Sequence, residues 1–366
     1  MARKLKSDRV LFLTTVLLVG VSIVMVYSAS AVLALERYHQ PEFYLARQLM
    51  WAALGIAVLA IVMRVDYRLY KEPVVIWSLF AAVTICLVVV LFRPPVNNAR
   101  RWLLIGGFGI QPSELAKLSV IFFIAGLLER RRERINELGY ALLPIALTVA
   151  LFAGLILLEP DFGTAMSLAL IAGVMVFAAG LNYAYVFGVL LASLPLVMFL
   201  VIGTEYRRRR WQAFLNPWDD PLGDGFHIIQ SLIAVGTGGI RGRGLMDGVQ
   251  KLFYLPEPHT DFIYAVISEE AGLLGATVVL ACFVLVAWRG LRVAVRAPDT
   301  FGALVALGLT TMVAVQAFVN ISVVIGLMPT KGLALPFVSA GGSSLLINML
   351  GMGVLLNVSQ HASPDT

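Results

Sequence analysis

Charged side chains are scarce in this chain. Only 14% of its 366 residues are Asp, Glu, Lys or Arg, whereas 59% are hydrophobic. Soluble domains usually carry about 25% charged residues, so this composition excludes an ordinary water-soluble fold. The mean hydropathy of +0.86 indicates instead that most of the chain is embedded in lipid.

Residues that bind metals or nucleotides are also rare. The two cysteines, Cys86 and Cys282, lie in hydrophobic runs, and we predict that they pack as small apolar side chains without a disulfide or redox role. The four histidines show no metal-ligand spacing, so we expect no dedicated metal site. The glycine-rich residues 236–244, GTGGIRGRG, lack the Lys-Ser/Thr ending of a phosphate-binding loop. Any energy for a reaction must therefore come with the substrate.

Long hydrophobic runs dominate the rest of the sequence. Because about 20 apolar residues span a bilayer as a helix, we predict an all-α, polytopic integral membrane protein that forms a single domain over residues 1–366. The first run is too long for a signal peptide and is predicted to remain as an uncleaved helix. No internal repeat of the kind found in many transporters is visible. The ten predicted spans are residues 11–35, 46–63, 73–92, 112–128, 141–158, 163–181, 184–203, 262–288, 301–327 and 335–358.

The positions of Lys and Arg predict the orientation, because cytoplasmic loops carry an excess of these residues. Both termini are predicted to be cytoplasmic, and residues 204–261 then form one long extracytoplasmic loop. Almost half of the 28 Lys and Arg residues nevertheless fall on the outer side. We interpret this set as binding an anionic ligand, although contact with lipid headgroups is the alternative for any single member. The outer set is Arg37, Arg47, Arg93, Arg100, Arg101, Arg207, Arg208, Arg209, Arg210, Arg241, Arg243, Lys251 and Lys331.

The first polar stretch on the outer side, residues 97–117, begins NNARRW and ends QPSELAK. Ser113 is expected to cap the following helix, with Glu114 in the positive first turn. Glu114 and Lys117 are three residues apart and therefore share one helix face. An ionisable pair below the membrane interface is costly unless it faces a polar cavity, which favours a functional site over a purely structural ion pair.

Three further polar stretches lie on the same side. Residues 159–163, EPDFG, form a tight link that is either part of a site or only a helix-breaking turn. The long loop is rich in aromatics, prolines and glycines, and it ends in Asp261, which is either a functional acid or a helix cap. Residues 328–344 contain glycines and serines that permit close packing or a pocket lined by backbone.

Taken in order along the chain, these stretches resemble the SEDS family (shape, elongation, division and sporulation), which includes FtsW, RodA and SpoVE. The resemblance covers almost the whole chain, and residues 329–332, PTKG, are more similar to the division protein FtsW than to the elongation protein RodA. Asn98, Met246, Pro258 and Ala340 depart from the family pattern, but none of these changes removes a charged group. The motifs that carry the resemblance are YSAS, NNARRW, QPSELAKL, EPDFG, RRRRW with FLNPW, QKLFYLPEPHTDF, SEEAGLLG and PTKGLALPFVSAGGSS.

The resemblance implies a peptidoglycan glycosyltransferase that polymerises lipid II at the outer leaflet of the bacterial inner membrane, for cell division or elongation. It implies that Asp261, Glu114 and Lys117 are catalytic. Asp261 is our candidate for the general base that takes a proton from the attacking sugar hydroxyl. Outer cations would offset the negative charge that develops on the departing undecaprenyl pyrophosphate. The predicted substrate-binding residues are Arg100, Arg101, Arg210, Lys251, His259, Thr260, Lys331 and Ser343.

A different class of function, a lipid II flippase, would use the same cations for transport. It would need a polar path to the cytoplasmic leaflet, whereas the ionisable residues within spans lie in the outer half, at Glu114, Lys117, Asp161, Glu269 and Glu270. This placement favours an enzyme, and a purely structural scaffold would leave the outer charges unexplained. A divalent cation, Mg²⁺ or Mn²⁺, could help to neutralise the pyrophosphate, but the sequence shows no dedicated cage for it. Nothing indicates binding to nucleic acid.

Crosslinking of the glycan requires a partner, because no extracellular domain with a Ser-x-x-Lys transpeptidase motif is present. The resemblance implies a class B penicillin-binding protein, together with other divisome or elongasome membrane proteins. We predict that the membrane helix of this partner docks on small residues of the spans at 262–288 and 301–327, at Gly272, Gly275, Gly302 and Gly308.

Overall fold

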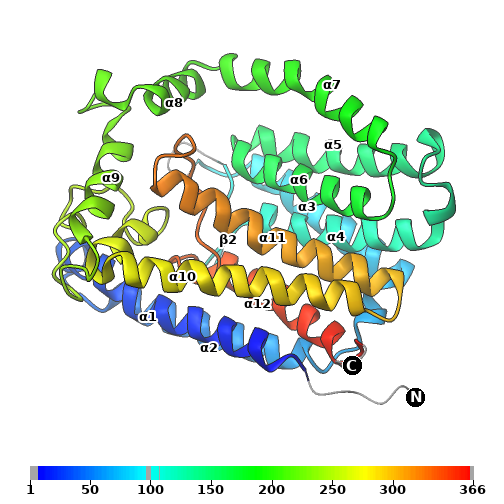
Figure 1. Ribbon diagram of the computed structural model, residues 1–366, viewed down its shortest axis with the longest axis horizontal. Coiled ribbons are helices and arrows are strands. Elements are labelled where there is room, and N and C mark those ends of the chain that lie inside the picture. Colours follow the sequence, from blue (N-terminus) through cyan, green and yellow to red (C-terminus); the bar gives the residue numbers. More distant parts are fainter. Residues whose placement is uncertain (1–6, 96–99, 107, 363–366) are drawn as a thin grey trace.

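The structure, a computed structural model, describes residues 7–95, 100–106 and 108–362, so residues 97–99 of the NNARRW stretch lie outside it. The described chain is a bundle of helices with one small hairpin (Figure 1). The helices are α1 (Arg9–Tyr38), α2 (Phe43–Val62), α3 (Pro73–Leu91), α4 (Pro112–Arg131), α5 (Leu143–Leu158), α6 (Phe162–Ala178), α7 (Tyr183–Ile202), α8 (Glu205–Leu215), α9 (Phe226–Gly238), α10 (Ile263–Arg296), α11 (Thr300–Val324) and α12 (Gly342–Ser359), and the strands are β1 (Leu103–Ile105) and β2 (Phe108–Ile110).

Each of the ten predicted spans coincides with a helix, namely α1 to α7 and α10 to α12. Seven helices in the described part of the chain are long and apolar enough to cross a membrane, judged by length and composition. The two helices that match no predicted span, α8 and α9, lie in the long loop at 204–261. The prediction of an all-α membrane protein is therefore confirmed, with the two three-residue strands as its one departure.

The predicted start of the last span is wrong, because α12 begins at Gly342 and not at residue 335. Residues 325–341 form an irregular segment, which we call the α11–α12 linker. Within it the N–H of Leu335 donates to Ser339 Oγ at 2.7 Å, and Phe337 has a φ of 63°, so the chain turns here. The buried side chains of this turn are as apolar as those of a helix, and hydropathy does not distinguish the two.

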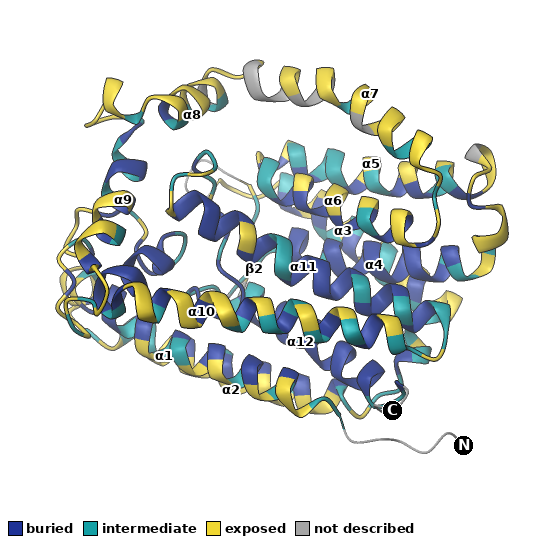
Figure 2. Ribbon diagram, in the orientation of Figure 1, coloured by how far each residue is buried: buried dark blue, intermediate teal, exposed yellow. Residues whose placement is uncertain are grey.

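The two ends of the described chain lie together at one end of the bundle, and α8 and α9 lie at the opposite end (Figure 1). We call that opposite end the loop end. The interior of the bundle is formed mainly by α4, α11 and α12, whose residues are mostly buried (Figure 2). Helices α4, α10 and α12 begin at Pro112, Ile263 and Gly342, and these starts lie near the site described below.

The glycines predicted to dock a partner helix do not form a lipid-facing groove. Gly272, Gly302 and Gly308 are buried inside the bundle. A Cβ at Gly308 would lie 2.9 Å from Ile121 Cγ2, because α4 packs closely against α11 at this point. The docking prediction is therefore wrong at these three positions, since glycine spacing marks close packing inside a bundle as well as on its surface.

Helix α7 differs from the other long helices because none of its described side chains is buried. Figure 1 shows α7 and α8 forming an arch along one edge of the bundle. Pro195 lies inside α7, where it removes a backbone donor and weakens the helix. The described side chains of α7 therefore face the surroundings of the bundle and not its interior.

Candidate functional site

The β1–β2 hairpin leads directly into α4. Leu103 pairs with Ile110 across the antiparallel strands, and Gln111 follows as the N-cap residue of α4. The prediction that Ser113 caps this helix is wrong, because Pro112 already occupies the first turn, where its missing N–H costs nothing. Ser113 Oγ instead accepts a hydrogen bond from Gln111 Nε2 at 3.0 Å.

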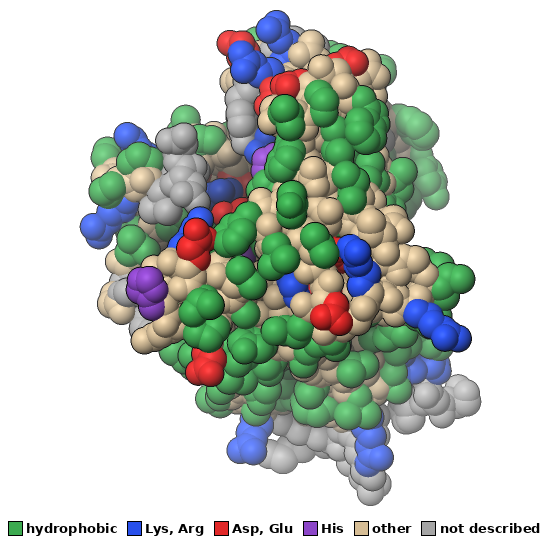
Figure 3. All heavy atoms as spheres, turned by 90° about the vertical axis from the view of Figure 1, so that its left-hand side faces the viewer, with side chains coloured by type: hydrophobic (Ala, Val, Ile, Leu, Met, Phe, Trp, Pro, Cys, Tyr) green, Lys and Arg blue, Asp and Glu red, His purple; other side chains and the backbone are tan. Residues whose placement is uncertain are grey.

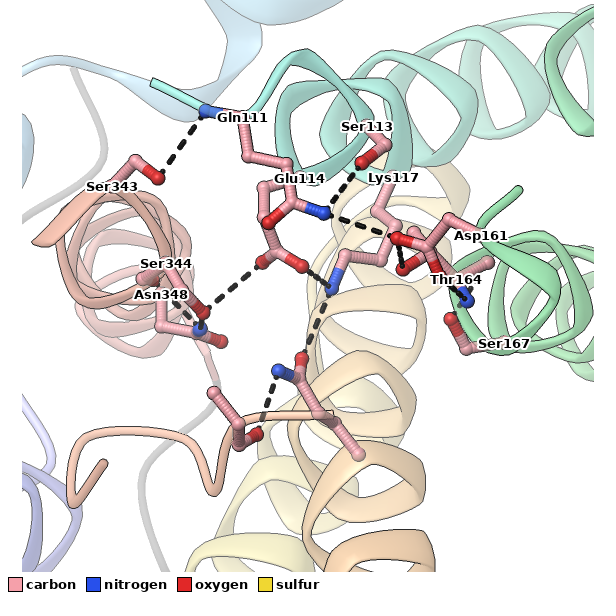
Figure 4. Close-up of polar contacts among 12 residues, drawn as sticks. Gln111, Ser113, Glu114, Lys117, Asp161, Thr164, Ser167, Ser343, Ser344 and Asn348 are labelled. Atoms are coloured by element: carbon pink, nitrogen blue, oxygen red, sulfur yellow. Dashed lines mark hydrogen bonds and ion pairs between the residues drawn. The ribbon is translucent and has the colours of Figure 1, made fainter. Parts of the chain in front are cut away.

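Glu114 and Lys117 form a buried ion pair, as their spacing predicts. Lys117 Nζ lies 2.8 Å from Glu114 Oε1, and the two side chains are only 2% and 5% exposed. Lys117 also donates to Gln316 Oε1 of α11 at 3.0 Å, and Ser344 Oγ of α12 donates to Glu114 Oε2 at 3.3 Å (Figure 4). A buried pair requires such added hydrogen bonds to offset the loss of hydration. The pair therefore joins three interior helices at one point.

Asp161 is both a helix cap and a member of this polar network. Its Oδ1 accepts from the N–H of Thr164 at 3.1 Å, which caps α6. Its Oδ2 accepts from Thr164 Oγ1 at 2.8 Å and from Gln111 Nε2 at 3.1 Å (Figure 4). The EPDFG stretch is therefore a turn that connects the start of α6 to the start of α4.

Glu159 is an acid that the sequence reasoning missed as a site residue. It is 0% exposed, and neither carboxyl oxygen has a hydrogen-bond partner among the described residues. Burial and the negative charge of Asp161 raise the pKa of Glu159 to about 8, and Arg101 opposes this shift. Both effects favour the neutral form of this carboxyl group near pH 7. Its position two residues before Asp161, in a link between apolar helices, was the available signal.

Asp261 lies against the α11–α12 linker. Asn320 Nδ2 of α11 donates to the carbonyl oxygens of Asp261 at 2.8 Å and Leu333 at 2.7 Å, so one side chain holds the two segments together. A Cβ added at Gly332 would lie 2.9 Å from Asp261 Oδ2. Glycine at position 332 thus allows the linker to approach the carboxylate, next to Lys331 in the chain.

The surroundings of Asp261 favour a role as a base. Burial raises the pKa of Asp261 to about 6, and the charge of Glu257 adds to this effect. Arg101 and Arg210 act in the opposite direction and limit the rise. A base with a pKa near the working pH is ionised and still accepts a proton readily, which is the condition for efficient general base catalysis.

Cations from three segments lie near the acidic residues of this region: Arg101 and Arg210 act on Asp261, and Lys331 lies near Asp161. Lys331 Nζ lies 4.8 Å from the centre of the Phe162 ring, and burial lowers the pKa of Lys331 to about 8, against the influence of Asp161. Arg210 Nη1 of α8 donates to the carbonyl oxygen of Thr330 at 3.1 Å. Figure 3, which faces the loop end, shows acidic and basic side chains set into a hollow on this face.

The structure brings several predicted substrate-binding residues to this place. Arg101, Arg210 and Lys331 surround the acidic residues as described above. Ser343 accepts from the N–H of Gln111 at 3.3 Å, and the carbonyl oxygen of Thr260 accepts from Ser339 Oγ at 2.6 Å. These contacts place the start of α12 and the end of the long loop beside α4 and the linker.

Three other predicted residues lie in different surroundings. Arg100 is exposed and donates to the carbonyl oxygen of Leu91 at 3.1 Å. The ring of His259 is buried against Tyr44 at 4.6 Å, and burial lowers the pKa of His259, which favours the neutral ring. Lys251 is buried in an ion pair with Glu270 at 2.6 Å. The structure does not bring these side chains into the cluster around Asp261.

Among the described residues, no group of three or more His, Cys, Asp or Glu side chains is arranged to hold a metal ion. Asp161 uses both of its oxygens in hydrogen bonds to Thr164 and Gln111.

The fold and the site together define a multi-pass membrane protein with buried, ion-paired acids and partly buried cations at one end of its bundle. A family model described as cell cycle protein, FTSW_RODA_SPOVE, matches residues 8–364. The chain therefore belongs to the FtsW/RodA/SpoVE family, and the resemblance found in its motifs is confirmed.

Individual relatives agree with this assignment. The chain is 44% identical over 361 residues to the probable peptidoglycan glycosyltransferase FtsW of Geobacter metallireducens, over 97% of this chain and 95% of the relative. It is 42% identical over 366 residues to the stage V sporulation protein E of Bacillus subtilis, over 98% and 99% of the two chains.

Two solved structures have the same fold. One belongs to a peptidoglycan synthase complex described as coordinating polymerization and crosslinking, with a TM-score of 0.81, 31% identity and coverage of 98% of this chain and 99% of the other. The other is the rod shape determining protein RodA of Thermus thermophilus, with a TM-score of 0.73, 27% identity and 98% coverage of both chains.

Proposed function

We propose that this chain is a peptidoglycan glycosyltransferase that polymerises lipid II at the outer leaflet of the inner membrane. The observation that carries the proposal is the partly buried Asp261, which lies against Gly332 of the α11–α12 linker. Its pKa of about 6 suits a general base, and the charges of Arg101 and Arg210 act on it. Relatives of similar length over the whole chain are named peptidoglycan glycosyltransferases, which supports the same activity here.

The proposed reaction joins two sugars and releases a lipid pyrophosphate. Asp261 takes the proton from the attacking hydroxyl, whose oxygen forms the new bond to the anomeric carbon of the donor. The bond from that carbon to the pyrophosphate breaks, and its electron pair stays on the phosphate oxygen. Arg101, Arg210 and Lys331 offset the charge that develops there, which is where preorganised cations lower a barrier most effectively.

Glu114 and Lys117 support this chemistry from below the surface of the site. Lys117 bonds to Gln316, and Gln316 Nε2 donates to the carbonyl oxygen of Ala334 in the α11–α12 linker at 3.0 Å. The buried pair is thus connected to the segment that carries Lys331. We propose that the pair contributes to catalysis by fixing the position of this segment. Glu114 also accepts a hydrogen bond from the hydroxyl of Ser344 at the start of α12.

The distribution of buried charge supports a polymerase over a flippase. Among the described residues, the buried Asp, Glu, Lys and His side chains lie at the start of α4, in the α5–α6 link, in the long loop and in the first turns of α10. All of these places belong to the loop end, and a flippase would need a comparable path to the other leaflet. We place the loop end outside the cytoplasmic membrane and both termini in the cytoplasm.

We propose that a class B penicillin-binding protein supplies the crosslinking activity. A solved relative belongs to a peptidoglycan synthase complex described as coordinating polymerization and crosslinking, which supports a partner of this kind. This partner does not dock on Gly272, Gly302 or Gly308, because these glycines are buried inside the bundle. Other divisome or elongasome membrane proteins would join through this partner or beside it, and co-purification from membranes is the direct test.

Polymerisation by the purified protein tests the proposed function. The protein in detergent or vesicles would be incubated with lipid II, with and without the partner, and glycan polymer measured on gels. Asp261→Asn should yield no polymer, whereas Asp247→Asn, an exposed acid in the same loop, should behave as wild type. Lipid II transfer across vesicles without any polymer would instead establish a flippase.

A further inference from the structure

Helix α10 is interrupted shortly after Asp261. Gly272 has a φ of 66° and a ψ of −166°, which no residue within a continuous helix adopts. The first part, residues 263–271, is therefore a short helix of its own, which we call the outer piece of α10. Because Asp261 lies two residues before it, the position of this piece determines the position of Asp261.

The glycine-rich residues 239–244 fill the interruption. Backbone hydrogen bonds that α10 cannot make to itself are made to this segment instead, on both sides of Gly272. This explains the GTGGIRGRG sequence, which does not form a phosphate-binding loop. The bonds are Arg243 N to Glu269 O at 3.0 Å, Gly244 N to Glu270 O at 3.1 Å, Leu273 N to Gly239 O at 2.9 Å and Leu274 N to Ile240 O at 3.2 Å.

Glycine is required where the two backbones meet. A Cβ at Gly242 would lie 2.1 Å from the carbonyl oxygen of Glu270, and one at Gly272 would lie 2.2 Å from the nitrogen of Gly242. Real atoms do not approach so closely, and both residues have positive φ values. The close approach of loop and helix is therefore built into the sequence at two glycines.

The side chain of Glu270 holds the next part of the loop. Its carboxylate accepts from Lys251 Nζ at 2.6 Å, from Ser28 Oγ of α1 at 2.7 Å and from the N–H of Met246 at 3.1 Å. Lys251 Nζ also donates to Ser28 Oγ at 2.9 Å. Lys251 and Glu270 are 4% and 0% exposed at their side chains, so this cluster is closed to solvent.

The carboxylate of Glu269 also binds the loop to the outer piece of α10. Its oxygens accept from the N–H groups of Val249 at 2.8 Å and Gln250 at 3.1 Å, and Arg243 lies 3.4 Å from the same carboxylate. Residues 239–251 are thus bound to the outer piece of α10 by backbone and by two buried carboxylates. Glu270 is nine residues beyond Asp261, about 13 Å away along a helix.

We propose that Lys251 is a positioning residue, whose ion pair with Glu270 fixes the outer piece of α10 against α1 and thereby sets the position of Asp261. Lys251 was a substrate-binding candidate from sequence, and its enclosure with Glu270 and Ser28 reassigns it. This proposal rests on the polymerase function proposed above, which would depend on the ion pair of Lys251 with Glu270.

Charge balance in the cluster provides the test. Removing Lys251 alone leaves a buried carboxylate without its cation, whereas removing both charges together relieves that penalty. Lys251→Met should lower kcat for polymerisation by on the order of 10- to 100-fold, with little change in KM, because small displacements of a catalytic group have effects of this size. Lys251→Met with Glu270→Gln should recover to within about threefold of wild type, because the amide still accepts from Ser28 and Met246.

Amide hydrogen exchange gives a readout that does not depend on activity. The N–H groups of Met246, Val249 and Gln250 donate to the buried carboxylates, so their exchange should accelerate in Lys251→Met and return toward wild type in the double variant. Asp219→Asn, which removes an exposed charge elsewhere in the same loop, is the control and should change neither exchange nor kcat.

Ser28→Ala is a milder variant for the case that Lys251→Met does not fold. It should lower kcat about threefold and accelerate the same amides, since one donor to Glu270 is lost. Rescue by Glu270→Gln, together with the exchange pattern, supports positioning. The proposal would be overturned if the wild type polymerises, Lys251→Met raises KM and leaves kcat unchanged, and Glu270→Gln does not rescue it. Lys251 would then be a substrate-binding residue. A wild type without polymerisation would count against the proposed function instead.

Discussion

Replacing Glu159 with glutamine should stabilise the protein at neutral and alkaline pH. Glu159 is completely buried, and neither oxygen has a hydrogen-bond partner among the described residues. Burial and Asp161 raise its pKa from 4.5 to about 8. Glutamine has nearly the same shape and cannot ionise, so the variant isolates the effect of the proton.

The magnitude follows from the two pKa values. Below pH 4.5 both the folded and the unfolded chain hold the proton, and Glu159 costs nothing. Between pH 4.5 and about 8 only the unfolded chain loses it, so stability falls as the pH rises toward the folded pKa. Each pH unit in this window costs about 1.4 kcal/mol, or about 3 kcal/mol in all at pH 7.

Thermal unfolding in detergent across pH 5 to 9 measures this effect. The apparent Tm of Glu159→Gln should exceed that of wild type by on the order of 5 °C at pH 7, and the difference should shrink as the pH is lowered to 5. Glu36→Gln, an exposed acid at the end of α1, should show no such difference. Parallel Tm profiles for wild type and Glu159→Gln would refute the reasoning that Glu159 is held neutral.

Three other tests address the site and the orientation. Asp261→Asn should reduce polymerisation at least about 100-fold because the base is lost, and wild-type activity should decline as the pH falls through about 6, where Asp261 gains its proton; a flat profile from pH 5 to 7 would remove Asp261 from the mechanism. Glu114→Ala and Lys117→Ala should each cause a severe loss, and the double variant should be little worse than either, whereas strictly additive losses would show that the pair does not act as a unit. A single cysteine at Arg132 should resist labelling from outside intact cells, and its labelling there would reverse the orientation.

The helical framework could be predicted from sequence because it depends on local properties. An apolar run of about 20 residues predicts a helix. Each of the ten runs corresponds to a helix, and seven helices of the described chain are long and apolar enough to cross a membrane. The spacing of Glu114 and Lys117 likewise placed them on one helix face, where they form the buried pair. Both results follow from the geometry of a single segment.

The partners of individual polar residues could not be predicted, because they come from distant parts of the chain. Lys251 was correctly assigned to the long loop, but its partners are Ser28 in α1 and Glu270 in α10, and neither contact follows from local spacing. The glycine docking prediction failed for the same reason, since the pattern at Gly302 and Gly308 does not specify the opposing helix.

The α11–α12 linker has a consequence for how the protein is synthesised and inserted. Its carbonyl groups at Leu333 and Ala334 are bonded by side chains of Asn320 and Gln316, which are four residues apart on one face of α11. Unpaired backbone groups in hydrocarbon cost several kcal/mol each. Both donors precede the linker in the chain, so they have already left the ribosome when the linker emerges. The linker can therefore bind to α11 before α12 emerges, and loss of Asn320 should reduce the yield of inserted protein more than the turnover of molecules that mature.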